Sequence, residues 1–277
     1  MNLGVPFGII AALAFGGGDF AGGLASRRVA GITVVAVAQA VGFVLLLVVL
    51  IVQRPAAPDA GSLLLAAAAG AFGGVGLLAL YRGLAMGSMG VVTGISGVGS
   101  VSIPLVIGWA IGHAPVAPLQ WLGVLVAMAA IAAASGATRS GVKPRALALG
   151  VVAAVLFGLW FVFLDLAATS DTAWPLVVSR GAATLFIGVP SLLQRRFAHM
   201  RSTWPLMIGA GTLDVAGNTG YVLSRATIPV GVAAALAGLY PVITMLLARL
   251  VLRESLPPLG MLAVALAVAG ILLISLG

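Results

Sequence analysis

The stretch Gly17-Gly-Asp-Phe20 recurs in altered form as Gly158-Leu-Trp-Phe161, and this recurrence decides the predicted fold. Both copies lie inside long apolar runs, and the offset between them is 141 residues. The same offset places Gln39 over Arg180, which are polar residues in otherwise apolar surroundings. Because the order of such matches holds along the whole chain, the sequence predicts two related halves, 1–138 and 139–277.

The amino-acid composition is too apolar for a protein that folds in water. Of 277 residues, 62% are hydrophobic and 7% are charged, whereas a soluble domain carries about 25% charged residues. Such a chain cannot cover a water-exposed surface, so a soluble enzyme is excluded. The apolar runs are continuous rather than alternating, which excludes a β-barrel, and the absence of Cys excludes disulfides and thiol chemistry.

Windows of high hydropathy are separated by short breaks rich in Pro, Gly and Arg. A membrane helix needs about 20 apolar residues, so the windows predict an all-α membrane protein with ten transmembrane helices in two inverted five-helix repeats. The predicted spans are Val5–Leu24, Ile32–Val52, Ser62–Met86, Gly90–Ile111, Leu119–Ser135, Ala146–Ala168, Ala173–Leu193, Pro205–Ala226, Pro229–Leu252 and Pro258–Ser275.

Five spans per half is an odd number, so the second half must enter the membrane from the opposite side. The charges between spans agree: Arg27 and Arg28 follow the first span, whereas Asp171 follows the sixth. The positive-inside rule then predicts a multi-pass protein of the cell inner (plasma) membrane with both termini outside. A net charge of +8 has the same origin, so no nucleic-acid partner is expected.

The end of the second half resembles the EamA family of the drug/metabolite transporter superfamily. The resemblance rests on Tyr240-Pro241 in mid-helix, on Glu254 at the helix exit and on Gly260 in a glycine-rich last span. Near the start, Gly17-Gly-Asp19-Phe20 resembles the family's Trp-Gly-Ser-Asn-Phe, with Asp19 in the Asn place. The resemblance implies export of amino acids and related metabolites, a central cavity, and cytoplasmic termini, the last in contrast to the charge count.

Charged groups inside a bilayer need a partner, a cavity or a route to the interface. For Asp19 two interpretations stay open, a substrate-amine or proton site and an ion pair with Arg27 or Arg28. Asp214 and Asn218 are four residues apart on one predicted helix face, so they either line the cavity or clamp a neighbour such as Arg180.

Aromatic residues complete the predicted site. Trp160 falls midway along its span and offers a π face to an aliphatic, aromatic or cationic group. The candidate substrate-binding residues are Asp19, Tyr81, Ser96, Trp160, Asp214, Asn218, Tyr221 and Tyr240. The candidate structural or gating residues are Gln39, Pro104, Arg180 and Pro241.

Two features of the sequence also fit functions other than amino-acid export. A first-helix carboxylate is the coupling site of small multidrug antiporters, so Asp19 keeps a proton-coupled multidrug or cation exporter as the alternative. Gly94-Ile-Ser96-Gly97 spells the Gly-x-Ser-Gly of rhomboid proteases, and His113 and His199 exist, but in so glycine-rich a chain this match is weak support for an intramembrane enzyme.

The remaining expectations concern ligands and assembly. The sequence contains no His-Glu-x-x-His and no Gly-x-x-x-x-Gly-Lys-Ser/Thr, so we expect no catalytic residue, metal or cofactor and no ATP site. Transport would be facilitated or driven by a gradient, with proton coupling as one option. The expected partners are a small-molecule substrate and the lipid bilayer, around a monomer.

Overall fold

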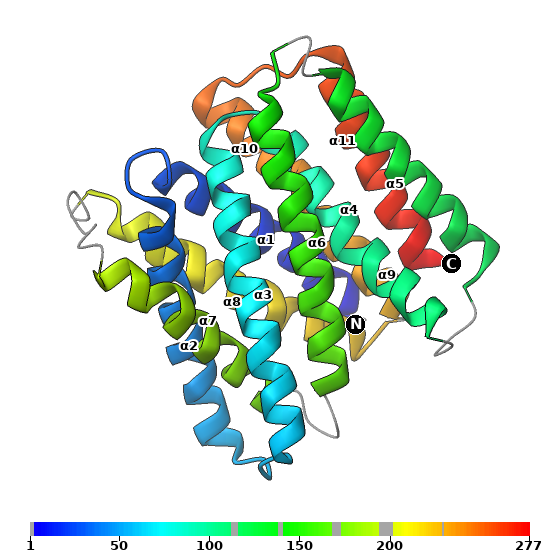
Figure 1. Cartoon of the computed structure of the whole chain (residues 1–277). Helices are drawn as coiled ribbons and strands as arrows, with labels where there is room; N and C mark the ends of the chain where they lie inside the picture. Colours follow the sequence, from blue (N-terminus) through cyan, green and yellow to red (C-terminus); the bar gives the residue numbers. More distant parts are fainter. Residues whose placement is uncertain (1–2, 112–115, 138–140, 168–172, 194–201, 229) are drawn as a thin grey trace.

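The computed structural model describes residues 3–111, 116–137, 141–167, 173–193, 202–228 and 230–277, and within them it contains helices and no strand (Figure 1). Helix ends lie within two residues of the expected spans, and the ninth span is divided in two. The helices are α1 (Gly4–Ala25), α2 (Gly31–Gln53), α3 (Ala60–Ala85), α4 (Met89–Ala110), α5 (Pro118–Ala137), α6 (Pro144–Ala167), α7 (Ala173–Leu193), α8 (Trp204–Arg225), α9 (Val230–Ala237), α10 (Tyr240–Leu252) and α11 (Pro258–Leu276).

Eight stretches of the described chain are long and apolar enough to cross a membrane, with α9 and α10 counted together as Val232–Leu252. The apolar stretch of α5, Pro118–Ala134, is shorter, and α8 carries the polar residues Asp214 and Asn218. An all-helical membrane protein is therefore confirmed. The count of ten crossings stays a prediction.

The division between α9 and α10 has a local cause. Pro241 has no N–H to donate to the carbonyl of Ala237, so the regular helical ladder cannot continue through it. The chain instead tightens into short-range bonds, from Leu239 N to Leu236 O at 3.2 Å and from Val242 N to Leu239 O at 3.0 Å. Pro104 lies inside α4, which continues without a break.

Helices of one half pack mainly on helices of the other. The main pairs are α1 with α8, α3 with α6, α2 with α7, and α5 with α11, and α4 also packs on α6 and on α10. In Figure 1, α5 and α11 lie side by side at one edge of the bundle, next to the C-terminus. The other helices form the body of the molecule, where the candidate residues lie.

The two halves run in opposite directions. A Cβ added at Gly23, near the end of α1, would lie 2.7 Å from Leu84, near the end of α3. A Cβ added at Gly83 would lie 3.4 Å from the carbonyl of Ala146, near the start of α6. The first helix therefore ends where the sixth begins, as the predicted inversion requires.

Close glycine contacts show which residues of the two halves are equivalent. A Cβ added at Gly70 of α3 would lie 2.2 Å from the carbonyl oxygen of Ser179, and one at Gly211 of α8 would lie 2.4 Å from that of Ala38. These contacts exchange under an offset of 141 residues. Between α1 and α6 the offset is 142, because Gly217 meets Phe15 as Gly76 meets Phe157.

The register corrects one match made from the sequence. Asp19 is not equivalent to Trp160; at an offset of 142, Gly18 corresponds to Trp160 and Asp19 to Phe161. The sequence match was wrong by one residue because the second half has one residue fewer between its first helix and the middle of its second.

The repeat symmetry is incomplete. In the first half α1 packs against α3 and weakly against α4, and α2 packs against α3. Among the described residues, the equivalent pairs α6 with α8, α6 with α9 or α10, and α7 with α8 make at most marginal contact. The halves have therefore taken different arrangements, and the first is the more closed.

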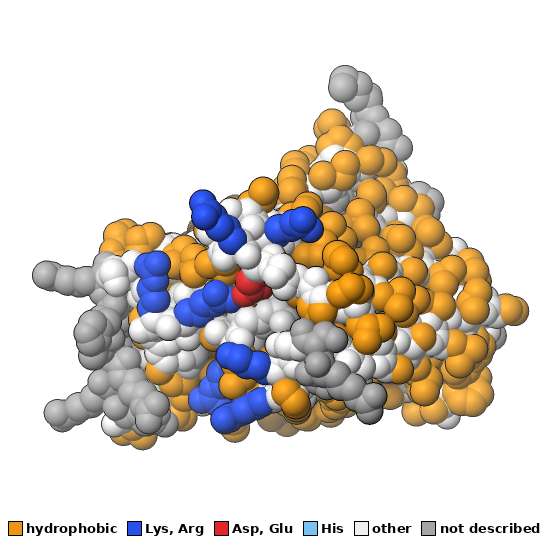
Figure 2. Space-filling view, turned by 90° about the horizontal axis from the view of Figure 1, so that it is seen from above, with side chains coloured by type: hydrophobic (Ala, Val, Ile, Leu, Met, Phe, Trp, Pro, Cys, Tyr) orange, Lys and Arg blue, Asp and Glu red, His pale blue; other side chains and the backbone are white. Residues whose placement is uncertain are grey.

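Positive charge gathers at one end of the bundle, which we call the basic end. Figure 2 looks onto this end and shows Lys and Arg side chains around an acidic group, bordered by hydrophobic surface. Asp171, which the sequence places after the sixth span, lies outside the described residues, and so do the basic residues Arg139, Arg195, Arg196 and Arg201. Basic residues of the described connections and helix ends here are Arg27, Arg28, Arg82, Lys143, Arg145, Arg249 and Arg253.

Candidate substrate-binding site

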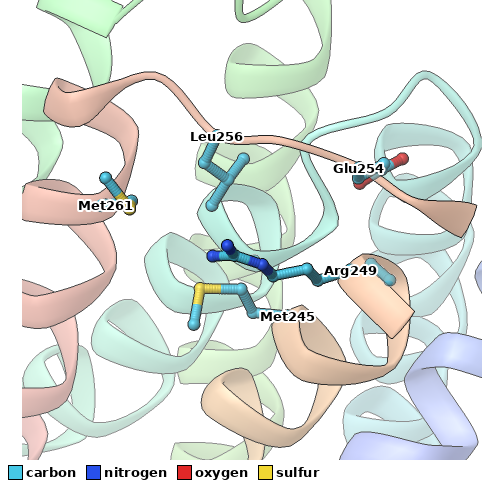
Figure 3. A pocket seen from close by; sticks show the side chains of 7 residues that line it. Met245, Arg249, Glu254, Leu256 and Met261 are labelled. Atoms are coloured by element: carbon cyan, nitrogen blue, oxygen red, sulfur yellow. The ribbon is translucent and has the colours of Figure 1, made fainter. Parts of the chain in front are cut away.

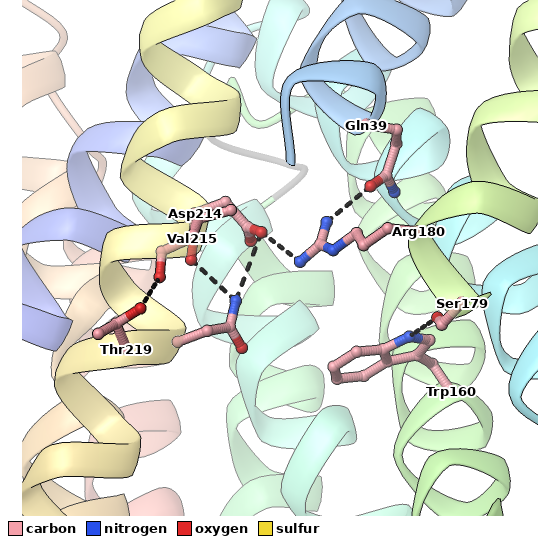
Figure 4. Close-up of polar contacts among 8 residues, drawn as sticks. Gln39, Trp160, Ser179, Arg180, Asp214, Val215 and Thr219 are labelled. Carbon is pink, nitrogen blue, oxygen red and sulfur yellow. Dashed lines mark hydrogen bonds and ion pairs between the residues drawn. The ribbon is translucent and has the colours of Figure 1, made fainter. Parts of the chain in front are cut away.

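The centre of the candidate site is an ionic network that joins three helices (Figure 4). Arg180 of α7 forms an ion pair with Asp214 of α8, and its other terminal nitrogen donates to Oε1 of Gln39 on α2 at 2.6 Å. Nδ2 of Asn218 donates to the backbone carbonyl of Asp214 at 2.8 Å and lies 3.4 Å from its carboxylate. The predicted clamp between Asp214 and Arg180 is thus present.

The network lies on the inward side of α8, but its charged side chains keep some exposure to solvent. The side chain of Arg180 is 11% exposed and that of Asp214 is 31% exposed. Pairing compensates the cost of placing either charge among apolar helices, which is about 3 kcal/mol or more for an isolated charge in a bilayer. Because an arginine has five N–H donors, two bonds leave Arg180 with donors for a further acceptor.

Trp160 lies beside this network and is held in place. Its Nε1 donates to the hydroxyl of Ser179, the residue before Arg180, at 3.0 Å. Its ring packs on α3, where a Cβ added at Gly73 would lie 2.7 Å from Cδ1. Figure 4 shows the indole and the guanidinium as neighbours between α6, α7 and α8. An apolar face is thus presented close to a cation and a carboxylate.

Asp19 differs from Asp214, because it has no hydrogen bond or ion pair with any other described residue. It is half-buried on α1, in the same region of the bundle as Asp214 and the neutral side chains of Tyr81 and Tyr240. The predicted alternative of an ion pair with Arg27 is not found, since Arg27 pairs with Glu254. The carboxylate of Asp19 is therefore left without a hydrogen-bond or ionic partner within the described part of the chain.

The remaining candidate residues occupy different surroundings. Tyr81 is only 2% exposed, and its ring packs against Gly22 of α1. The hydroxyl of Tyr240 lies next to Ser96 and Gly97 of α4, and its ring meets Phe15 edge to face at 6.3 Å between centroids. Ser96 is fully buried. Tyr221 is half-buried on α8, one turn beyond Asn218.

The structure therefore brings most of the predicted residues into one region, but their side chains differ in how accessible they are. Asp19, Asp214, Arg180 and Trp160 are partly accessible, whereas Gln39 is buried at 3% exposure behind Arg180. Tyr81 and Ser96 are packed into helix interfaces, and Pro104 and Pro241 shape α4 and the break before α10.

Sequence reasoning missed two participants. Ser179 holds Trp160, and its signal was a small hydroxyl directly before an intramembrane arginine. Glu254 was noted only as part of a family pattern, yet it pairs with Arg27 and accepts a hydrogen bond from Met89 N at 3.2 Å. It thereby connects the ends of α1, α4 and α10 at the basic end.

Catalytic and metal chemistry gain no support from the geometry. No group of three or more His, Asp or Glu side chains placed to hold a metal occurs among the described residues. His113 and His199, the potential partners of Ser96 in a protease, lie outside those residues. Ser96 itself is enclosed between helices.

Comparison with known proteins agrees with this arrangement. A sequence model of the EamA-like transporter family matches residues 2–136 and 144–276, which confirms the resemblance inferred from Tyr240-Pro241 and Glu254. No curated protein matches the chain. A solved structure titled "Crystal structure of protein" aligns with a TM-score of 0.63 at 16% identity, over 99% of this chain and 97% of that one, which shows a shared fold alone. Because the two family matches span nearly the whole sequence, the chain belongs to the EamA-like transporter family.

Proposed function

We propose that the protein is a secondary transporter that exports small zwitterionic metabolites, chiefly neutral or aromatic amino acids. The observation that carries this proposal is the carboxylate of Asp19, which has no partner among the described residues and lies close to the Arg180–Asp214 pair inside the bundle. A zwitterion has one group for each charge: its ammonium suits Asp19, and its carboxylate suits the remaining donors of Arg180.

The rest of the substrate would meet apolar and aromatic surface. Trp160 is fixed by Ser179 with its ring near Arg180, so it offers a preorganised contact for a substrate side chain. Asn218 and Gln39 provide amide groups that hydrogen-bond the polar end. With polar groups around one part of the substrate and an aromatic ring beside the other, the site favours amino acids with apolar or aromatic side chains over highly charged ones.

Transport by alternating access follows from two halves of opposite direction around this region. The basic end is the proposed cytoplasmic face, because Lys and Arg gather on that side of inner-membrane proteins. Both termini would then be outside. The sequence has no nucleotide-binding motif, so we propose that a solute or proton gradient drives the step.

The proposal is tested by counterflow in liposomes that contain the purified protein. Labelled neutral and aromatic amino acids should accumulate against preloaded unlabelled substrate, and Asp19→Asn should abolish the accumulation. Asp165→Asn is the matched control, because Asp165 is an exposed carboxylate of α6 away from the network. Absence of counterflow with every amino acid tested, or equal loss in both variants, would contradict the proposal.

The second candidate is a proton-coupled exporter of multidrug cations, favoured by the same Asp19 with Tyr81 and Tyr240 near it. Drug cations tested in the same liposomes distinguish the two functions. This candidate requires transport of the cation to depend on an imposed pH gradient and to lose that dependence in Asp19→Asn. Normal pH dependence in that variant would rule out Asp19 as the coupling group.

A further inference from the structure

A pocket at the basic end, outside the candidate substrate site, combines positive charge with an apolar lining (Figure 3). It lies where α10 ends and α11 begins, and α4 closes its inner side. Its outer part has a volume of about 400 Å³, within the usual range for a ligand pocket, and a narrower part of about 50 Å³ lies further in. Its lining includes Arg249, Arg253, Met245, Leu256 and Met261.

The two arginines of this pocket form no ion pair within the described part of the chain. Arg249 is exposed and makes no hydrogen bond or ion pair with another described residue, and the same holds for the side chain of Arg253. The carboxylate of Glu254, at the edge of the pocket, is engaged by Arg27 and by Met89 N. Two guanidinium groups are thus left without a counter-ion among the described residues.

The two helices that border the pocket also carry exposed apolar side chains. Figure 3 shows Arg249 extended between Met245 and Leu256, toward Met261. Leu250, Val251 and Leu262, on the same two helices, are exposed large hydrophobic side chains of the kind that face lipid. The candidate spans end at Leu252 and begin at Pro258, which places the pocket at the depth of the lipid headgroups.

We propose that this pocket binds an anionic phospholipid. The phosphate of the headgroup would lie on Arg249 and Arg253, and the acyl chains would follow the apolar surface past Met261. Charge alone would suit a free phosphate equally well, but the thioether and leucine lining and the exposed apolar side chains on the same two helices favour a molecule with a hydrocarbon part. The site does not depend on which substrate is transported.

Native mass spectrometry of the full-length protein in a neutral detergent tests the proposal. The probes are phosphatidylglycerol, phosphatidylcholine of the same chain length, and inorganic phosphate. We expect phosphatidylglycerol to bind at one saturable site. Arg249→Gln and Arg253→Gln should each weaken that binding about fivefold, from roughly 1 kcal/mol per basic residue near an anionic surface.

Two matched variants separate a site from general attraction. Arg28→Gln removes an exposed charge of the same end outside the pocket and should leave phosphatidylglycerol binding unchanged. Met261→Gln keeps both arginines and should still weaken binding, because it removes contact with the acyl chain. An equal effect of Arg28→Gln, equal binding of phosphatidylcholine, or displacement of the lipid by millimolar inorganic phosphate would each overturn the proposal.

Discussion

Arg180 is the residue on which the polar interior of the bundle depends, because it alone bonds to both α2 and α8 in the described network. Its partners divide between the halves, with Gln39 from the first and Asp214 from the second. An amide and a carboxylate together hold the guanidinium in one orientation. The pair is only partly buried, so its net contribution to stability is smaller than that of a fully enclosed ion pair.

Removing one partner of this pair should cost more than removing both. Asp214→Asn leaves the guanidinium without a carboxylate, and we expect it to lower the free energy of unfolding by about 2 kcal/mol. Adding Arg180→Gln should restore part of that loss, since no uncompensated charge remains. Thermal denaturation of the two single variants and the double variant in detergent measures this. Additive losses would show that the two charges do not interact.

Trp160 is expected to act on transport rather than on folding. Trp160→Ala should lower amino-acid flux about tenfold, from an aromatic contact of about 1.5 kcal/mol, without lowering expression. Trp160→Phe keeps a ring but loses the bond to Ser179, so it should lower flux only about twofold. Initial rates in liposomes at equal protein content check this order. Wild-type flux in Trp160→Ala would remove the residue from the site.

Among the helices, glycine contacts set how closely the elements approach one another. Without a hydrophobic effect between helices in lipid, close packing has to provide much of the association energy. Gly22 of α1 receives the ring of Tyr81 from α3, and a Cβ there would lie 2.1 Å from Cζ. This contact belongs to the half that is more closed.

Gly22→Ala should therefore destabilise the protein, by about 2 kcal/mol for an overpacked contact. Gly209→Ala on α8 is the control, because nothing lies within 4 Å of an added Cβ there. The control should be neutral or slightly stabilising, since alanine is the better helix former. Melting temperatures of the two variants under identical conditions decide the matter. A similar shift in both would mean that Tyr81 moves aside without cost.

The elements were largely predictable from the sequence, because continuous apolar runs of about twenty residues have few alternatives in a membrane. The break at Gly238 and Leu239 was harder to place, since proline alone does not say whether a helix bends or divides. Pro104 shows the other outcome, with α4 unbroken. The alignment of α1 with α6 from the sequence was wrong by one residue, because few side chains match between the halves. The glycine contacts that correct it depend on how the helices pack, which the sequence does not show.

The sequence predicted which residues belong to the candidate site, but not which of them contact one another. The carboxylates, the arginine and the tryptophan stood out because polar groups in apolar runs are costly and few. Which of them pair could not be read from spacing. Gln39, Arg180 and Asp214 come from three helices, so their meeting depends on the packing of the two halves, and Asp19 is distinguished only by the absence of a described partner.

For the molecule as a whole, the inequality of the halves is the main feature. Contacts of α1 with α3 and α4 near the basic end have at most marginal counterparts between α6 and α8 or α10. At that end Glu254 ties together the ends of α1, α4 and α10. If the first half took the looser packing of the second half, and the second half took the closer packing of the first, the basic end would open and the opposite end would close.

Removing the contacts of Glu254 with Arg27 and Met89 should therefore increase the separation of the helices at the basic end. In a chain without native Cys, spin labels at Arg28→Cys and Leu250→Cys report the separation of these elements. We expect Glu254→Ala to lengthen and broaden the measured distance distribution in electron paramagnetic resonance. Glu254→Gln should have a smaller effect, because its amide oxygen still accepts from Met89 N. An unchanged distribution in Glu254→Ala would show that other contacts hold this end.

The bond between Gln39 and Arg180 has a bearing on ancestry. On a twofold axis a residue faces its own copy, so two identical five-helix chains would bring like against like at this place. Two arginines would repel one another, and two glutamines would leave the carboxylate on α8 without a cation. Only after the gene is duplicated can the two copies evolve separately, so an asymmetric charged centre here requires two copies that have diverged.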